Sequence, residues 1–326
     1  MSKENAAFDV CVVGEINLDL IMYGLPEYLA PDRELLANNL SVTLGSSSAI
    51  CAHNLASLGS RTAFVSLVGE DPLGQVSLER LAASGADVSR VKRAPAPAMT
   101  GLTVVFPYHG RRYILTYPGV MSLMRFEDLD LDFIRQARHL HVSSFFLHRA
   151  LRPQMAGLFR IAKEAGMTTS LDTNDDPEDK WELGTVLRYV DVFFPNDREA
   201  RKVARKAELI QALDVLSAQV PLVVVKCGRQ GAVARRGKEQ SLSPVPIVEA
   251  VDTIGAGDSF NAGFLHQFVR GEKLETCLAW GNLAGSFSIT RAGGTEAFRE
   301  RAHLEKYFRE HGFPLDNTPA GKSQKP

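Results

Sequence analysis

The chain alternates short apolar runs with amphipathic stretches, and the alternation becomes regular after residue 129. Short runs of β-branched and other apolar residues indicate buried strands of a parallel sheet. Stretches whose apolar residues recur every three to four positions indicate helices packed on that sheet. We therefore predict an α/β fold with a doubly wound, mostly parallel sheet flanked by helices. The predicted strands are 8–13, 63–68, 139–143, 168–172, 190–194 and 222–226, and the predicted helices are 149–165, 199–206, 209–219 and 274–290.

Two segments interrupt this alternation with the pattern of a small β-sheet. Residues 17–44 contain β-type runs, and residues 97–118 contain two such runs on either side of a turn at His109-Gly110. Two alternating runs that flank a short turn are typical of a β-hairpin. We predict that both segments form a lid on one domain that spans residues 1–326. The polar tail at 314–326 is expected to be disordered.

Composition and charge narrow the possible partners. The 326 residues include 45% hydrophobic residues, enough for a large core, and carry a formal net charge of −1. This charge excludes a broad basic surface for nucleic acid, and no apolar run approaches the ~20 residues that cross a bilayer. The N-terminus lacks the pattern of a signal peptide, so we expect a cytoplasmic protein that acts on small molecules. Its four cysteines are far apart, which argues for free buried residues and against a zinc site.

The stretch 251–264 carries the strongest sign of chemistry. Gly255, Ala256 and Gly257 leave the backbone uncovered at the start of a predicted helix, so that successive N–H groups can form a cradle for an anion. Asp258 follows directly. A carboxylate there either caps the helix or takes a proton from a nucleophile during phosphate transfer. The pattern indicates phosphoryl transfer, with Asp258 as the base and the cradle holding the charge of the phosphate.

This stretch also resembles a known family. Asp-Thr-x-Gly-Ala-Gly-Asp-x-Phe-Asn-Ala-Gly-Phe at 252–264 is similar to the C-terminal signature of the ribokinase-like (PfkB) carbohydrate kinases. Gly-x-x-Asn-x-Asp at 14–19 resembles their sugar-binding motif, which implies that Asn17 and Asp19 bind sugar hydroxyls. Where the family has Gly-Gly-x-x-x-Asn, this chain has Gly45, Ser46 and Ile50.

The departure at this third motif affects the expected substrate. The resemblance implies that Gly45 and Ser46 contact the substrate, whereas Ile50 in place of asparagine argues against ribose. The same residues open a helix predicted for 45–59, and a serine at its start is expected to act as the N-cap.

The resemblance also assigns the magnesium and the phosphates of ATP. Asn196 and Glu199 match the family's Asn-x-x-Glu, which acts on hydrated Mg²⁺ and the phosphates, and oxygen ligands that reach the ion through water suit it. Read without the family, Asn196 is a helix cap. Lys226 ends a predicted strand just before Gly228, and it either holds a phosphate as a point charge or extends into solvent.

Further positions of the nucleotide end follow only from the family. The helix at 274–290, which includes Asn282, is implied to wall the adenine together with the loops beside it. Backbone carbonyls near Asp252 and Ile254 are implied to bind a monovalent cation, for which K⁺ is the candidate.

We therefore expect an ATP-dependent kinase that phosphorylates a primary hydroxyl of a neutral sugar. Asp175 and Asp176 stand where relatives specific for sugar acids would have an arginine, and their charge would repel an acidic substrate. Arg111 and Arg112 in the lid would have the opposite effect if they reached the site.

Two alternatives stay open. One is a nucleoside kinase, in which Phe106 or Phe146 would contact the base. The other is a regulator that binds sugar or nucleotide without catalysis, although such a protein has no need of a base at Asp258. The resemblance also implies a possible homodimer through the lid.

Overall fold

A computed structural model describes residues 6–109 and 111–315 of the chain. Its main sheet has eight strands among these residues, in the order β14-β13-β12-β11-β10-β9-β1-β4. Strands β4 to β12 pair in parallel, and β13 and β14 add an antiparallel edge, which confirms the mostly parallel sheet. The strands are β1 Phe8–Val13, β4 Thr62–Val65, β9 Ala137–Val142, β10 Thr168–Leu171, β11 Val192–Phe193, β12 Leu222–Lys226, β13 Ala232–Arg236 and β14 Glu239–Ser243.

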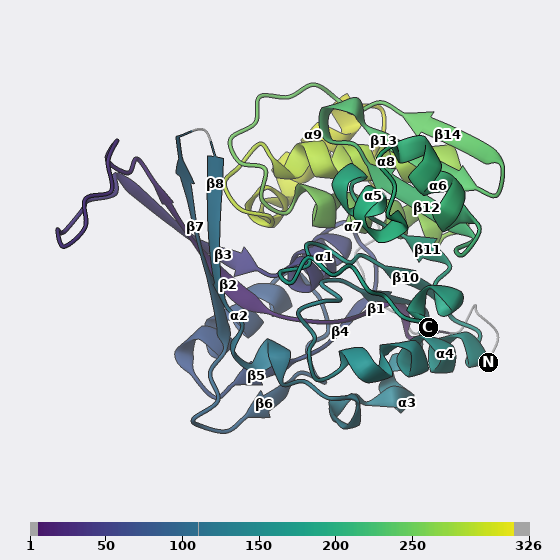
Figure 1. Ribbon diagram of the computed structural model, residues 1–326, viewed down its shortest axis with the longest axis horizontal. Helices are drawn as coiled ribbons and strands as arrows, with labels where there is room; N and C mark the ends of the chain where they lie inside the picture. The colour runs from purple at the N-terminus through teal and green to yellow at the C-terminus, as the bar shows by residue number, and fades with distance from the viewer. Residues whose placement is uncertain (1–5, 110, 316–326) are drawn as a thin grey trace, which may run out of the picture.

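Helices cover both faces of this sheet (Figure 1). Alternate residues of a strand point to opposite faces, so Cys11 and Val13 pack into one apolar cluster while Val10 and Val12 pack into the other. Burying such side chains on both faces stabilises the fold by roughly 1.5–3 kcal/mol for each large apolar residue. The first cluster includes α3 Leu131–Ile134, α4 Met155–Glu164, α5 Asp197–Ala204 and α6 Leu209–Ser217, and the second includes α1 Ser47–Ser57, α2 Pro72–Ala82, α7 Ala256–Phe268 and α8 Leu274–Ser288.

The C-terminal part of the described chain packs on α8. Helix α9 Arg301–Glu310 buries Leu304 and Phe308 in a third apolar cluster with Trp280. Leu315 belongs to the same cluster and is 9% exposed. The predicted start of the tail at 314 is therefore too early, because Leu315 is still packed in this apolar cluster. Residues 316–326 of that prediction lie outside the described residues.

The smaller sheet projects to one side of the main sheet (Figure 1). Its strand order is β3-β2-β7-β8, in which β2 and β7 are parallel and the outer pairs are antiparallel. These strands come from the two segments predicted to form the lid. Gly110, at the predicted hairpin turn, lies outside the described residues. The strands are β2 Asn17–Tyr23, β3 Asn39–Gly45, β7 Gly101–Tyr108 and β8 Arg111–Tyr117.

Two predicted elements differ in the structure. The strand predicted for 63–68 ends at Val65. After Ser66 the chain turns away, and Leu67–Gly69 pairs as β5 with β6 Lys92–Ala94, since apolar residues on both sides of one serine do not show where a chain changes sheets. Helix α1 begins at Ser47. The residue before it, Ser46, has φ 70° and makes no side-chain cap, so the predicted serine N-cap is wrong.

Candidate active site

The glycine-rich turn lies at the start of α7. Gly255 precedes the first helical residue with φ 71°, and a Cβ atom on it would lie 2.5 Å from the Cα of Gly294. Only glycine fits this left-handed, close-packed position. The first backbone N–H groups of a helix have no acceptor within it, so those of Gly257 and Asp258 are available to a bound anion, while that of Ala256 donates to the carbonyl of Thr253 at 3.5 Å.

Asp258 lies in the first turn of α7 and is only 7% exposed. Burial raises the pKa of this carboxyl, the charge of Asp172 raises it further, and the nearby Lys226 and a hydrogen bond from Ser47 oppose the rise, leaving the pKa at about 7. A general base is most effective when its pKa lies near the working pH. The environment of Asp258 therefore suits proton abstraction at neutral pH better than helix capping alone requires.

The four residues predicted to contact the sugar lie together where the lid joins the main body. A Cβ atom on Gly45 would lie 2.0 Å from Asp19 Oδ1 and 2.5 Å from Asn17 Oδ1, so the glycine makes room for both side chains. Ser46 Oγ donates a hydrogen bond of 2.9 Å to Asn17 Oδ1. Asn17 Nδ2 in turn donates to Thr103 Oγ1 at 2.9 Å.

Asp19 has a raised pKa, as Asp258 does. It is 5% exposed, and burial followed by the charge of Asp258 raises its pKa to about 7. The two carboxylates therefore share one low-dielectric region. A substrate hydroxyl that binds to Asp19 would therefore lie within the electrostatic influence of Asp258.

A cavity of about 580 Å³ opens beside the glycine-rich turn. Its walls are mainly apolar and include Val245, Ile247, Phe260 and Ile289, while Lys226, Gly228 and Gly257 lie along one side. An apolar slot that ends at an anion cradle has the shape and polarity for an adenine nucleotide. Asn282 also lines it, and Asn282 Nδ2 donates to the carbonyls of Ser243 and Pro244, so this residue holds the wall in place.

Lys226 lies at the centre of the site and not in solvent. Its Nζ forms an ion pair with Asp172, which is fully buried. Burial lowers the pKa of Lys226, but the charges of Asp172 and Glu199 outweigh it, and the pKa lies above its usual value. The Nζ atom is 3.4 Å from where a Cβ would stand on Gly257, so the ammonium borders the anion cradle.

Asn196 and Glu199 form a reciprocal cap at the start of α5. Asn196 Oδ1 accepts from the backbone N–H of Glu199 at 2.9 Å, and Glu199 Oε2 accepts from that of Asn196 at 2.8 Å. Burial, together with the charge of Asp172, raises the pKa of Glu199 to about 7. Both residues thus have a structural role and also place a carboxylate and an amide next to Asp172 and Lys226.

The segment before the turn joins three parts of the molecule. Asp252 accepts hydrogen bonds from the backbone N–H groups of Ile254 at 3.0 Å and Gly293 at 3.1 Å. From the lid, Tyr23 Oη donates to Asp252 at 3.5 Å, and Arg112 Nη1 donates to Thr253 Oγ1 at 3.2 Å. The smaller sheet therefore contacts the segment before the glycine-rich turn as well as carrying Asn17 and Asp19.

Comparison with known proteins agrees with this arrangement. The pfkB family carbohydrate kinase model matches residues 7–301. The chain belongs to this family. It is 30% identical to an ATP-dependent ribose-1-phosphate kinase of Halopiger xanaduensis, over 88% of this chain and 94% of the relative. An uncharacterized sugar kinase of Archaeoglobus fulgidus is 29% identical, over 74% of this chain and 96% of the relative.

The fold is also that of solved family structures. Arabidopsis thaliana ribokinase, complexed with ribose and ATP, superposes with a TM-score of 0.79 at 25% identity, over 93% of this chain and 99% of that chain. This likeness confirms the predicted doubly wound sheet with a smaller sheet beside it.

Within this family, the structure removes the predicted basis for rejecting acidic sugars. Asp176 is 4% exposed and accepts hydrogen bonds from the backbone N–H groups of Glu178, Lys180 and Trp181, so it shapes its own loop. Asp175 pairs at the surface with Arg198 at 2.7 Å. Neither carboxylate forms a hydrogen bond or ion pair with the residues predicted to contact the sugar in the described part of the chain. The lid residue Arg112 does reach the site.

The two phenylalanines considered for a nucleoside base also point elsewhere. Register places Thr103 and Val105 on the same face of the lid as Asp19, so Phe106 lies on the opposite face, stacked 5.4 Å from Tyr113. Phe146 is buried and packs edge-on against Trp181.

Residue-by-residue reading of the sequence missed part of the centre. Asp172 accepts from Asn261 Nδ2 at 2.6 Å as well as from Lys226, and thereby ties β10 to α7 and β12. The available signal was the position of Asp172 directly after a buried strand, at the sheet edge where ligands of α/β folds bind.

No three His, Cys, Asp or Glu side chains converge as a metal site within residues 6–109 and 111–315. In the same part of the chain, no helix is long and apolar enough to cross a membrane.

Proposed function

We propose that this protein is an ATP-dependent kinase that phosphorylates a primary hydroxyl of a neutral sugar. The observation that carries the proposal is Asp258, a buried carboxylate with a pKa of about 7 at the start of α7. On one side lie Asn17, Asp19 and Gly45, and on the other lies the apolar cavity of about 580 Å³. A base between a hydroxyl site and a nucleotide site is the arrangement that phosphoryl transfer needs.

The reaction would move one proton and one phosphoryl group. Asp258 takes the proton from the sugar hydroxyl as that oxygen forms a bond to the γ-phosphorus, and the bond from the γ-phosphorus to the β,γ-bridging oxygen breaks to release ADP. Backbone N–H groups after Gly255 hold the transferred charge. Lys226 stands beside the cradle and stabilises the same charge, and Asp19 orients the sugar.

The donor set fits a hydrated Mg²⁺. Asn196 and Glu199 supply an amide and a carboxylate. After burial, the charge of Asp172 raises the pKa of Glu199, and a cation beside these two carboxylates would relieve their repulsion. When bound, Mg²⁺ supplies charge neutralisation on the nucleotide phosphates. A monovalent cation such as K⁺ is proposed at the backbone of Asp252 and Ile254, where Gly293 brings the closing loop alongside.

A neutral substrate is proposed on new grounds. The sugar end presents the carboxylates of Asp19 and Asp258, and we infer that their repulsion of an acidic substrate outweighs the attraction of Arg112, which reaches Thr253. The names of the relatives support ATP as the phosphate donor and a sugar as the acceptor. A nucleoside kinase is the alternative, but Phe106 and Phe146 no longer support it.

The test is a substrate panel with ATP and Mg²⁺, in which ADP release is coupled to NADH oxidation. The panel contains fructose, ribose, ribose 1-phosphate, adenosine and ketodeoxygluconate, and phosphorus NMR locates the new ester. We expect a neutral sugar to be phosphorylated at a primary hydroxyl, and Asp258→Asn to lose this activity. Asp132→Asn, the same change at a 90% exposed side chain, is the matched control. Preferred turnover of adenosine, of ribose 1-phosphate or of ketodeoxygluconate would refute the neutral-sugar class, and a fully active Asp258→Asn would refute the mechanism.

We also propose that the enzyme is a homodimer formed by the outer face of the lid. Register places a row of apolar side chains on the face opposite Asp19, and several are more than one-third exposed. Contiguous exposed apolar side chains of this kind are typical of association surfaces. The row includes Leu40, Val42, Tyr113, Leu115 and Tyr117.

A further inference from the structure

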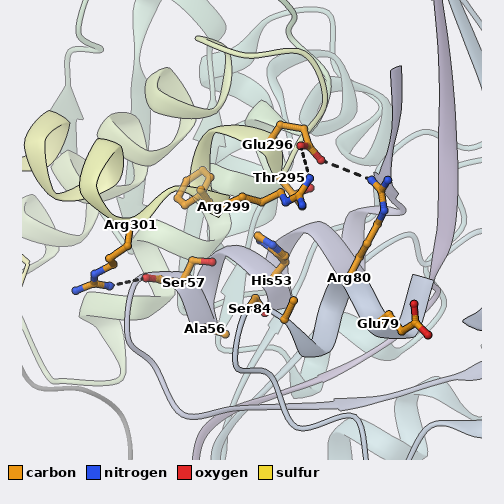
Figure 2. Close-up of a pocket in the computed structure, with 12 residues that line it drawn as sticks. His53, Ala56, Ser57, Glu79, Arg80, Ser84, Thr295, Glu296, Arg299 and Arg301 are labelled. Atoms are coloured by element: carbon orange, nitrogen blue, oxygen red, sulfur yellow. Dashed lines mark hydrogen bonds and ion pairs between the residues drawn. The ribbon is translucent and has the colours of Figure 1, made fainter. Parts of the chain in front are cut away.

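A separate cavity of about 550 Å³ lies between α1, α2 and the segment that leads into α9 (Figure 2). None of the residues that line it also lines the nucleotide cavity. Figure 2 shows Arg80 and Arg299 directed at Glu296 from two sides, with His53 beneath them on α1. The cavity therefore combines arginines at its mouth with a buried histidine at its base.

The tautomer of His53 follows from the hydrogen bonds of its neighbour. Asn54 Nδ2 donates to the carbonyl of Gly294 at 3.0 Å, and a carbonyl can only accept, so Asn54 Oδ1 faces His53 Nδ1 at 2.9 Å. His53 Nδ1 must therefore carry the proton. His53 is 3% exposed, and burial lowers its pKa to about 4, so the ring is neutral and its Nε2 is an acceptor.

Two acceptors in this cavity lack a donor. Within the described part of the chain, no hydrogen bond uses His53 Nε2, and Glu296 Oε1 is buried without a hydrogen-bond partner. The nearest charged donor to Glu296 Oε1 is Arg80 Nη1, at 3.7 Å. Glu296 Oε1 is a buried acceptor without a donor, which is costly. A ligand with hydroxyl groups could donate to it and to His53 Nε2.

The charge of the lining favours an anionic group on that ligand. Arg80, Arg299 and Arg301 outnumber Glu79 and Glu296 in the lining, and His53 is neutral. Arg301 is also paired with Glu305 at 2.7 Å, so Arg80 and Arg299 carry this argument. Arg299 is 57% exposed and uses Nη1 on Glu296, which leaves other N–H groups of its planar guanidinium for a phosphate.

We propose that this cavity binds a small phosphorylated polyol, whose hydroxyls donate to His53 Nε2 and Glu296 Oε1 and whose phosphate pairs with Arg299. The bound ligand would be connected to the catalytic helix. Asn54 Nδ2 also donates to Ser259 Oγ at 2.9 Å, and Ser259 follows Asp258. Phosphorylated sugars are the class that the proposed reaction produces, so the site would act in feedback. That role rests on the proposed function, whereas the binding does not.

The test is calorimetric titration with ribose 5-phosphate, without ATP, in Asp19→Ala protein, whose sugar site is disabled. We expect one site for ribose 5-phosphate, weakened roughly tenfold or more by adding Arg299→Ala because a charge-assisted contact is lost. Adding Arg309→Ala, an exposed arginine on α9 outside the cavity, should change nothing.

Three outcomes would overturn the proposal. They are unchanged binding in the Arg299→Ala protein, no binding in the Asp19→Ala protein, and binding of inorganic phosphate as tight as that of ribose 5-phosphate, which would show that the hydroxyls contribute nothing. Arg299 is at the surface, so its variant is expected to fold, and His53→Phe gives a second test of the acceptor. Because no turnover is measured, failure here leaves the proposed kinase reaction standing.

Discussion

The carboxylates of Asp19 and Asp258 interact electrostatically. After burial, the charge of Asp258 is the main cause of the raised pKa of Asp19. One residue comes from the lid strand β2 and the other from α7. Two such groups titrate as a pair, and a proton taken from substrate enters a region already short of positive charge. The first two predictions follow from this relationship.

Asp258→Asn should lower kcat by at least ~10²-fold while leaving ATP affinity unchanged, because a general base is lost and the cradle remains. In the wild type, kcat/KM should rise with pH through about 7, since Asp258 must be deprotonated to accept the proton. Steady-state kinetics over the range of about pH 5 to 8, where protein stability tends to be greatest, would check both. Turnover of the variant within a few-fold of wild type would contradict the assignment.

Asp19→Asn should raise the sugar KM and also stabilise the free enzyme. The folded-state pKa of about 7 exceeds the unfolded value of 3.8, so the folded protein holds an extra proton between these values and wild-type stability falls as pH rises from about 4 to 7. The Asp19→Asn variant has no carboxyl group at this position, so its stability does not fall in this way as pH rises. Its free energy of unfolding should therefore exceed that of wild type by on the order of a few kcal/mol at pH 8, and by less at pH 5.

The control for this measurement is Asp9→Asn. Burial raises the pKa of Asp9, but hydrogen bonds and charge from Arg61 outweigh it and leave the pKa low, so removing this carboxylate should destabilise the protein at pH 8. Urea unfolding at both pH values separates the cases. An Asp19→Asn protein that is less stable than wild type at pH 8 would show that its carboxylate is not strained in the fold.

Lys226→Met should destabilise the protein by about 3–5 kcal/mol, because it leaves the charge of Asp172 buried without its partner. Adding Asp172→Asn should restore most of that stability, while kinase activity stays low because the cation beside Gly257 is still absent. Thermal unfolding and turnover of the two single variants and the double variant complete the cycle. If the second change restores no stability, the ion pair is not the reason for the loss.

Leu115→Glu should convert the proposed dimer to monomer, since it places a charge in the apolar outer face of the lid, where Leu115 is 62% exposed. Sedimentation velocity measures the change. Leu242→Glu, at a 71% exposed leucine on β14, is the matched control and should leave the assembly unchanged. A wild type that sediments as a monomer, or a Leu115→Glu dimer, would exclude this surface.

The sequence predicted the main sheet and the smaller sheet because each has a local cause. Apolar periodicity placed the strands, and the turn before Asp258 needs glycine at a position whose φ is 71°. The predictions that were wrong depended on the direction in which a side chain points, which the sequence does not give. Asp176 and Phe106 have the right residue types near the right strands, but one binds its own loop and the other faces away from Asp19.

The centre of the site was the least predictable part. Asp172, Lys226 and Asn261 come from separate strands and a helix, and only the folded chain shows that one carboxylate accepts from both other side chains. Ser46 shows the same limit on a smaller scale. Its sequence position suits a helix cap, yet its φ of 70° turns it toward Asn17.

Strand β2 carries Asp19 near one end and Tyr23, which bonds Asp252, at the other. Because both residues belong to one strand, a smaller sheet that opens as the proposed lid would withdraw Asp19 from the proposed sugar site as it moves. Selection for a new sugar, whether in nature or in the laboratory, must therefore alter the timing of substrate entry and product escape together with the preference itself. Variants with changed specificity should be sought among those with changed release rates.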